Sequence, residues 1–281
     1  MLIALILTLT ILGSFGICYT SGAFFGFAWL WMLPACLVGI FILCLALAFG
    51  FLWLACQLAN TEKPQEQDSR FYRFITNLYV AAAIPLVRVK IKTAGLEKTP
   101  KDGRFLLVCN HIHDVDPAVL FRCFKKSQLA FIGKKETKDM FLVGKLMPKI
   151  LCQFVNREND REALKTILKC IEILKEDKAS VAVFPEGYIK PDRKLRHFRP
   201  GVFKIAQKAN VPIVVCTLRN TQYALPNFLK GGSTEVEMRL LDVIPAADLQ
   251  GKTTVEIADR VYAMMAADLG PELVAECEEN T

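Results

Sequence analysis

The residues of this sequence best placed to do chemistry are His111 and Asp116, which have four residues between them. His111 follows the apolar run 105–109, and a strand there would present it at its carboxyl end, where open α/β sheets place their sites. Asp116 precedes Pro117, which is typical of a helix start, so we expect one carboxylate oxygen to cap that helix and the other to hold the imidazole. A histidine paired with a carboxylate can activate a hydroxyl. Because residues 110–117 contain no Ser or Cys, we expect that hydroxyl to belong to a substrate, as in acyl transfer to an alcohol.

Two later blocks of the sequence end in further candidate site residues. Arg157 ends the block Phe154–Arg157, and Glu186 and Gly187 end the block Phe184–Gly187. Arg can hold a phosphate as a bidentate fork and Lys as a point charge. Gly187 would let the backbone approach a substrate, and amides around it are expected to supply donors for a tetrahedral oxyanion. A purely structural turn is the alternative for this third block.

Together with a first block, Asn110–Asp116, and a fourth, Val211–Val214, these two blocks resemble in order the four sequence blocks of the glycerolipid acyltransferase family. That family includes the 1-acylglycerol-3-phosphate acyltransferases. The resemblance covers about residues 70 to 220. A lone HxxxxD pattern is weak evidence, whereas four blocks in the right order are specific. The resemblance implies that His111 is the general base and that Asp116 orients it. We assign the following residues to substrate binding: Asn110, Lys134, Lys135, Arg157, Glu186, Gly187, Lys190 and Arg193.

The third block departs from the family pattern. Family members continue after the glycine with Thr or Ser and then Arg, but here Tyr188, Ile189 and Lys190 follow. Either Lys190 substitutes as a point charge or Arg193 reaches back across the loop. The sequence therefore leaves the head group of the acceptor open.

A metal site is the main competing interpretation of the first block. Residues 111–116 nearly match the His-x-His-x-Asp-His pattern of metallo-hydrolases, but carry Val and Asp where that pattern needs Asp and His. Besides His111 and His113, the chain contains only His197, so a histidine-rich site lacks ligands. We predict no metal and no cofactor, with acyl-CoA or acyl carrier protein as the acyl-donor co-substrate.

The first 61 residues contain no Asp, Glu, Lys, Arg or His. Leu2–Tyr19 and Trp29–Leu58 approach or exceed the length that spans a bilayer, and Gly22 and Gly26 lie between them. We predict a membrane hairpin, with one long span or a re-entrant hairpin as alternatives. The lack of a basic region before the first segment argues against a cleaved signal peptide.

The net charge of +7 lies entirely after this apolar segment. Such a domain suits anionic lipids and phosphorylated substrates, and no nucleic-acid motif is present. Basic residues after Asn60 predict an integral membrane protein whose catalytic domain faces the cytoplasm. Ten cysteines without CxxC pairs indicate reduced thiols, in keeping with that compartment.

We divide the chain into a membrane-embedded hairpin (1–60), a juxtamembrane interfacial segment (61–85) and an α/β acyltransferase domain (86–281). The mixture of basic, aromatic and apolar residues at 69–84 predicts an interfacial helix.

In the last of these parts, apolar runs alternate with helical patterns. Strands are predicted at 86–92, 105–109, 129–132, 153–155, 181–184 and 211–217, and helices at 116–125, 136–150 and 253–269. A further stripe at helical spacing is expected to face the core: Leu164, Ile167, Leu168, Ile171 and Leu174. The alternation implies an α/β fold with a mixed, largely parallel sheet flanked by helices, preceded by the N-terminal apolar hairpin.

The resemblance and these features together predict a membrane-bound O-acyltransferase. It would move an acyl group from an acyl thioester to the free hydroxyl of 1-acyl-sn-glycerol 3-phosphate and form phosphatidic acid for phospholipid biosynthesis. The expected partners are the lipid bilayer, the lysophospholipid acceptor and the acyl donor, without nucleic acid. The alternatives are a different acceptor (glycerol 3-phosphate or another lysophospholipid), a membrane-anchored metal-dependent hydrolase, and a non-catalytic lipid-binding relative.

Overall fold

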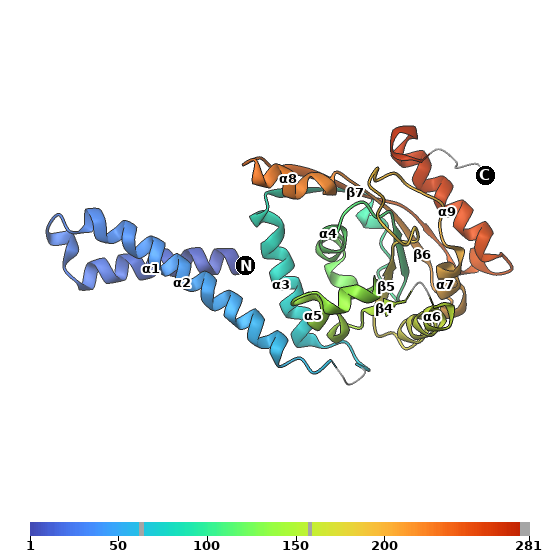
Figure 1. Cartoon of the computed structure of the whole chain (residues 1–281), viewed down its shortest axis with the longest axis horizontal. Helices are drawn as coiled ribbons and strands as arrows, with labels where there is room; N and C mark the ends of the chain where they lie inside the picture. Colours follow the sequence, from blue (N-terminus) through green and yellow to red (C-terminus); the bar gives the residue numbers. More distant parts are fainter. Residues whose placement is uncertain (62–64, 157–158, 276–281) are drawn as a thin grey trace.

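The computed structural model describes residues 1–61, 65–156 and 159–275. In these ranges a pair of long N-terminal helices projects from an α/β domain (Figure 1). α1 (Leu2–Thr20) and α2 (Trp29–Gln57) are joined by the short helix η1 (Ala23–Phe25). Their most apolar windows have mean hydropathies of 2.2 and 2.8, and only 22% and 6% of those windows is buried. Helices that are apolar on every side and largely uncovered do not resemble the core of a soluble domain, and both are long enough to cross a membrane.

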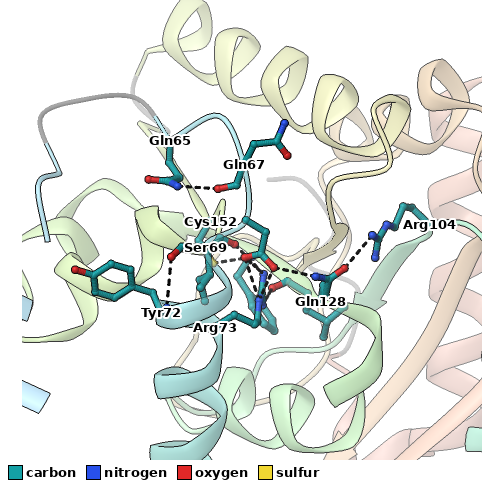
Figure 2. Close-up of polar contacts among 12 residues, drawn as sticks. Gln65, Gln67, Ser69, Tyr72, Arg73, Arg104, Gln128 and Cys152 are labelled. Carbon is teal, nitrogen blue, oxygen red and sulfur yellow. Dashed lines mark hydrogen bonds and ion pairs between the residues drawn. The ribbon is translucent and has the colours of Figure 1, made fainter. Parts of the chain in front are cut away.

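The hairpin is attached to the domain through α3 (Arg70–Leu86), whose N-cap is Ser69. The Tyr72 hydroxyl donates to the Ala55 carbonyl oxygen of α2 at 3.1 Å. On the opposite side, the buried Arg73 guanidinium donates to the Asp68 carboxylate at 3.0 Å and to the Ile150 carbonyl oxygen at 3.0 Å (Figure 2). Gln128 also donates to Asp68, at 3.1 Å. Separating a buried ion pair leaves an uncompensated buried charge, so these contacts are costly to break. They therefore hold the start of α3, where the chain from α2 enters the domain, in one position.

The described residues form one seven-stranded sheet in the order β1-β7-β6-β2-β5-β3-β4. Strands β2 to β6 are mutually parallel, β7 is antiparallel to β6, and β1 is parallel to β7. The predicted mixed, largely parallel sheet is therefore confirmed. The strands are β1 (Val89–Ala94), β2 (Leu106–Cys109), β3 (Leu129–Lys134), β4 (Gln153–Val155), β5 (Ser180–Val183), β6 (Ile213–Arg219) and β7 (Thr234–Ile244).

Helices cover both faces of this sheet. α3, α4 (Asp116–Cys123) and α5 (Val143–Lys149) pack on one face, and α6 (Asp160–Lys175), α7 (Lys204–Ala209) and α9 (Thr254–Leu269) pack on the other (Figure 1). β2 lies in the middle, and its side chains alternate between the two cores, with Leu106 and Val108 in one and Leu107 and Cys109 in the other. This is why β2 is apolar at every position and why the polar residues begin only after it ends.

Several predicted elements differ from the structure. The predicted helix 136–150 is divided into η4 (Lys135–Asp139) and α5, because the backbone folds back so closely that a Cβ on Gly144 would lie 2.0 Å from the Lys138 carbonyl oxygen. The strand predicted at 86–92 begins at Val89, since α3 extends to Leu86.

Two further differences concern a strand and a helix. β7 was not predicted, although its alternation of buried and exposed residues is the signature of a strand. The predicted stripe on α6 faces the core only in part: Ile167, Ile171 and Leu174 pack in or against the core. Leu164 and Leu168 are 49% and 56% exposed.

Candidate active site

The carboxyl ends of three neighbouring parallel strands meet at one place in the sheet. β2 lies between β5 and β6 in the strand order, so the residues that follow these strands converge on one edge. His111 follows β2, Glu186 follows β5 and Thr221 follows β6. The convergence fits the rule that open α/β sheets bind ligands at the carboxyl ends of their strands.

His111 and Asp116 form a hydrogen-bonded pair at this edge. The Nδ1 atom of His111 lies 2.8 Å from the Oδ2 atom of Asp116, with the histidine side chain 16% exposed and the aspartate side chain fully buried. A proton on Nδ1 donates to the carboxylate and leaves the Nε2 lone pair free to accept a proton. The His111 ring stacks on the Phe184 ring, with centroids 4.0 Å apart and planes 13° apart, which fixes its orientation. This is the arrangement of a general base with its orienting carboxylate.

The Asp116 carboxylate is satisfied by several donors. Oδ2 accepts from the backbone N–H groups of Ile112 at 2.7 Å and His113 at 2.9 Å, and Oδ1 accepts from the hydroxyl of the fully buried Thr221. These donors fix the carboxylate in the orientation in which Oδ2 meets the His111 ring.

The capping role predicted for Asp116 is wrong. The N-cap of α4 is Val115, and Asp116 is the first helical residue. Its carboxylate turns back toward the amides of the preceding loop because those amides, and not the helix's own, lie next to His111.

Thr221 was not identified from the sequence. The available signal was its place just after β6, where a parallel neighbour of β2 ends. Such a position becomes meaningful only when the strand order is known.

Glu186 joins the third block to the first. Its Oε1 accepts from the His111 N–H at 2.9 Å and its Oε2 from the Arg196 N–H at 3.2 Å. Burial raises the pKa of Glu186 to about 7, and the nearby Asp116 adds to the rise, against the two backbone donors that lower it. Glu186 therefore holds the backbone of His111 in place.

Gly187 adopts a left-handed backbone with φ +85°, and a Cβ there would lie 3.0 Å from the Arg199 Nε atom. A side chain at this position would be strained on both counts. The Gly187 N–H donates to the Phe184 carbonyl oxygen at 3.1 Å. Because the Gly187 N–H already has an acceptor, it is not free to donate to a tetrahedral oxyanion.

The structure places the other predicted substrate-binding residues at different distances from the pair. The Asn110 amide is buried and exchanges two hydrogen bonds with the backbone of Leu218 at 3.0 and 2.7 Å, so it ties β2 to β6. The Arg193 guanidinium donates to the Ile112 carbonyl oxygen, beside His111. The Lys190 ammonium is exposed and lies 5.1 Å from the centroid of the Tyr188 ring.

The remaining predicted cations belong to the β3 side of the sheet. Lys134 ends β3 and Lys135 begins η4, and both side chains are exposed. In the strand order β3 is separated from β2 by β5, a distance of two strand spacings or roughly 10 Å. Arg157, which follows β4 in the sequence, lies outside the described residues.

His113 does not take part in a metal cluster. Its Nδ1 accepts from the Val115 N–H at 3.2 Å, within the turn that leads into α4. Among the described residues, no three His, Cys, Asp or Glu side chains gather closely enough to hold a metal ion.

Residues 90–219 match the family model described as Acyltransferase. The chain is 32% identical over 160 residues to a probable 1-acyl-sn-glycerol-3-phosphate acyltransferase of Mycoplasma pneumoniae, covering 55% of this chain and 57% of that protein. It is 30% identical over 216 residues to a 1-acyl-sn-glycerol-3-phosphate acyltransferase of Chlamydomonas reinhardtii, covering 73% of this chain and 60% of that protein. The chain thus spans about three fifths of the length of these curated relatives.

The fold is similar to that of a solved structure, the 1-acyl-sn-glycerophosphate (LPA) acyltransferase PlsC from Thermotoga maritima. The TM-score is 0.59 with 20% sequence identity, covering 78% of this chain and 86% of that chain. At this identity the likeness concerns the fold.

Proposed function

We propose, on the premise that residues 90–219 belong to the acyltransferase family, that the protein transfers an acyl group from an acyl thioester to the free hydroxyl of 1-acyl-sn-glycerol 3-phosphate. The observation that carries this proposal is the pairing of His111 with the buried Asp116 at the carboxyl edge of the sheet. The curated relatives named above support the choice of acceptor, because both carry the name of that activity.

The geometry supports the following steps. The Nε2 atom of His111 takes the proton of the acceptor hydroxyl as its oxygen attacks the thioester carbonyl carbon. Asp116 stabilises the resulting imidazolium through Nδ1, at 2.8 Å. When the tetrahedral intermediate collapses, the carbon–sulfur bond breaks and the departing thiolate takes the proton from Nε2. The ester is then complete and His111 is neutral again.

The cations at the same edge suit a phosphorylated acceptor. Arg193 lies beside the His111 loop, and Lys134 and Lys135 lie two strands away. A phosphate bound between these positions would leave the acceptor's hydroxyl close to the imidazole. We assign Arg157 to the same phosphate on sequence grounds, because its fork matches phosphate geometry.

We further propose that α1 and α2 form the membrane hairpin and that the α/β domain faces the cytoplasm. Both helices contact the domain: α1 contacts α3, and α2 contacts α3 and α5. The basic residues that follow the hairpin support the cytoplasmic side. The catalytic edge would then lie close to lipid acceptors, with acyl-CoA or acyl carrier protein arriving from the aqueous side.

The test is turnover by the purified full-length chain in detergent, with one labelled acyl thioester and a panel of acceptors. We expect esterification of 1-acyl-sn-glycerol 3-phosphate ahead of glycerol 3-phosphate and of lysophospholipids that lack a phosphomonoester. His111→Ala protein serves as the control for uncatalysed transfer. Absence of transfer to every acceptor, from protein with an unchanged circular dichroism spectrum, would refute the proposed function and favour a non-catalytic lipid-binding role.

A further inference from the structure

Among the described residues of the α/β domain, three elements each expose three or more large apolar side chains. α8 (Ala224–Leu229) and the residue before it expose four, α3 exposes three, and the segment leading into α5 exposes three more. The members are Tyr223, Leu225, Phe228 and Leu229, then Phe71, Phe74 and Leu86, then Met140, Phe141 and Val143. Clustered exposed apolar side chains can mark an interaction site, and the group at α8 is the largest of the three.

α8 is built so that its apolar residues face outward. Ala224 is buried, and Asn227 donates to the Thr234 hydroxyl at 3.0 Å, which seats the helix on β7. Leu225, Phe228 and Leu229 have the spacing of one helical face and are 49%, 36% and 74% exposed. We call these three residues the α8 apolar face.

The surroundings of the α8 apolar face indicate what covers it. The Arg88 side chain, two residues beyond the end of α3, donates to the Gly231 carbonyl oxygen, so α8 and the exposed Leu86 belong to one region. Along the long axis of the molecule, α8 and α3 lie at the end from which the hairpin projects, while α9 and α6 lie toward the opposite end (Figure 1). Arg88 and Lys230 flank the apolar face and are both exposed. Apolar side chains rimmed by cations suit the boundary between acyl chains and anionic head groups.

We propose that the α8 apolar face is a second membrane contact, which inserts into the head-group boundary of the bilayer that holds the hairpin. The proposal rests on the membrane placement given under Proposed function and extends it to the catalytic domain. Thr221, which donates to Asp116, begins η6 (Thr221–Tyr223), and η6 leads directly into α8. The membrane contact would therefore hold the same segment that supports the catalytic carboxylate.

The test is photo-labelling of the full chain in vesicles of phosphatidylcholine and phosphatidylglycerol. The vesicles contain a phospholipid with a diazirine near the glycerol end of one acyl chain, and adducts are located by proteolysis and mass spectrometry. We expect adducts in the hairpin and on residues 223–230. Leu164 and Leu168 provide the internal control, because they are comparably exposed but lie on α6, on the other face of the sheet.

The labelling does not depend on turnover, so its outcome separates the surface from the proposed activity. Adducts on both the hairpin and residues 223–230, without adducts on α6, would support the surface even in an inactive protein. A labelled hairpin with residues 223–230 unlabelled, equal labelling of α6, or an unlabelled hairpin would each overturn it.

A matched pair of variants provides a second measurement. Leu229→Glu places a charge on the α8 apolar face, and Leu168→Glu places the same charge on exposed α6. With a bilayer-embedded acceptor, we expect Leu229→Glu to lower kcat/KM on the order of fivefold, and with a short-chain soluble acceptor we expect no change. Leu168→Glu should change neither. A loss that is equal for both acceptors, or equal for both variants, would overturn the proposal.

Discussion

Replacing Thr221 by Val tests whether the donor on the far side of Asp116 matters for catalysis. Val keeps the shape of the side chain but removes the hydroxyl that donates to Oδ1 of the fully buried Asp116. A hydrogen bond to a charged group contributes about 1.5 to 3 kcal/mol. If that stabilisation is lost when Asp116 must hold an imidazolium, kcat falls by about ten- to a hundredfold.

The loss should be smaller than that for His111→Ala, because the amides of Ile112 and His113 still hold Oδ2. KM for both substrates should stay nearly unchanged, since Thr221 is fully buried and its hydroxyl contacts Asp116.

The assay is steady-state kinetics with both substrates varied, beside thermal melts in the same detergent. Thr221→Ser is the matched control, because it restores the hydroxyl, and we expect it to recover most of kcat. A Thr221→Val protein with kcat within about twofold of wild type would refute the positioning role. So would a Thr221→Ser protein as impaired as Thr221→Val, because the loss would then arise from packing.

Four more perturbations probe the rest of the site. His111→Ala should reduce kcat by about 10²- to 10⁴-fold, and His113→Ala, whose ring makes only a local turn contact in the described structure, should keep most activity; reversed losses in the same turnover assay would reassign the base. Glu186, with its pKa raised from 4.5 to about 7, binds a proton in the folded chain that the unfolded chain releases, so the free energy of unfolding should fall by about 3 kcal/mol as pH rises through that window and stay low above it. Glu186→Gln should flatten this slope in thermal melts between pH 5 and 8, and an unchanged slope would point to another group. Dialysis against a strong chelator should leave turnover intact, whereas loss of activity together with stoichiometric zinc would favour the hydrolase alternative. Arg157→Ala should lower kcat/KM for the phosphorylated acceptor by about ten- to a hundredfold and Lys190→Ala by less, with the KM for the acyl donor unchanged in both. If neither variant distinguishes acceptors with and without a phosphomonoester, the head-group assignment fails.

Local patterns in the sequence were sufficient for much of the architecture. The uncharged start of the chain predicted α1 and α2 almost to the residue, because continuous hydrophobicity over the length of a span is rare outside membrane helices. β2, β3, β5 and β6 were predicted for a related reason: strands buried on both faces are apolar throughout and therefore easy to find. β7, which alternates and carries charges on its outer face, was overlooked.

The pairing of His111 with Asp116 could also be predicted from the sequence, because both residues lie in one short turn. Their supports could not. Thr221 and Glu186 are 105 and 75 residues from the groups they contact, and they meet them only because β6 and β5 flank β2.

Asn110 and Gly187 show that residue type alone does not identify the partner of a polar group. Their types suggested contact with substrate, but in the structure the Asn110 amide is occupied by Leu218 and the Gly187 N–H by Phe184. A sequence specifies which groups can donate and accept, whereas strand order and register decide which partners they meet. The sequence by itself predicted the two apolar helices, the fold class and the contact between His111 and Asp116. The tertiary structure alone decided which distant side chains hold that pair in place, because hydrogen bonds form between neighbours in space.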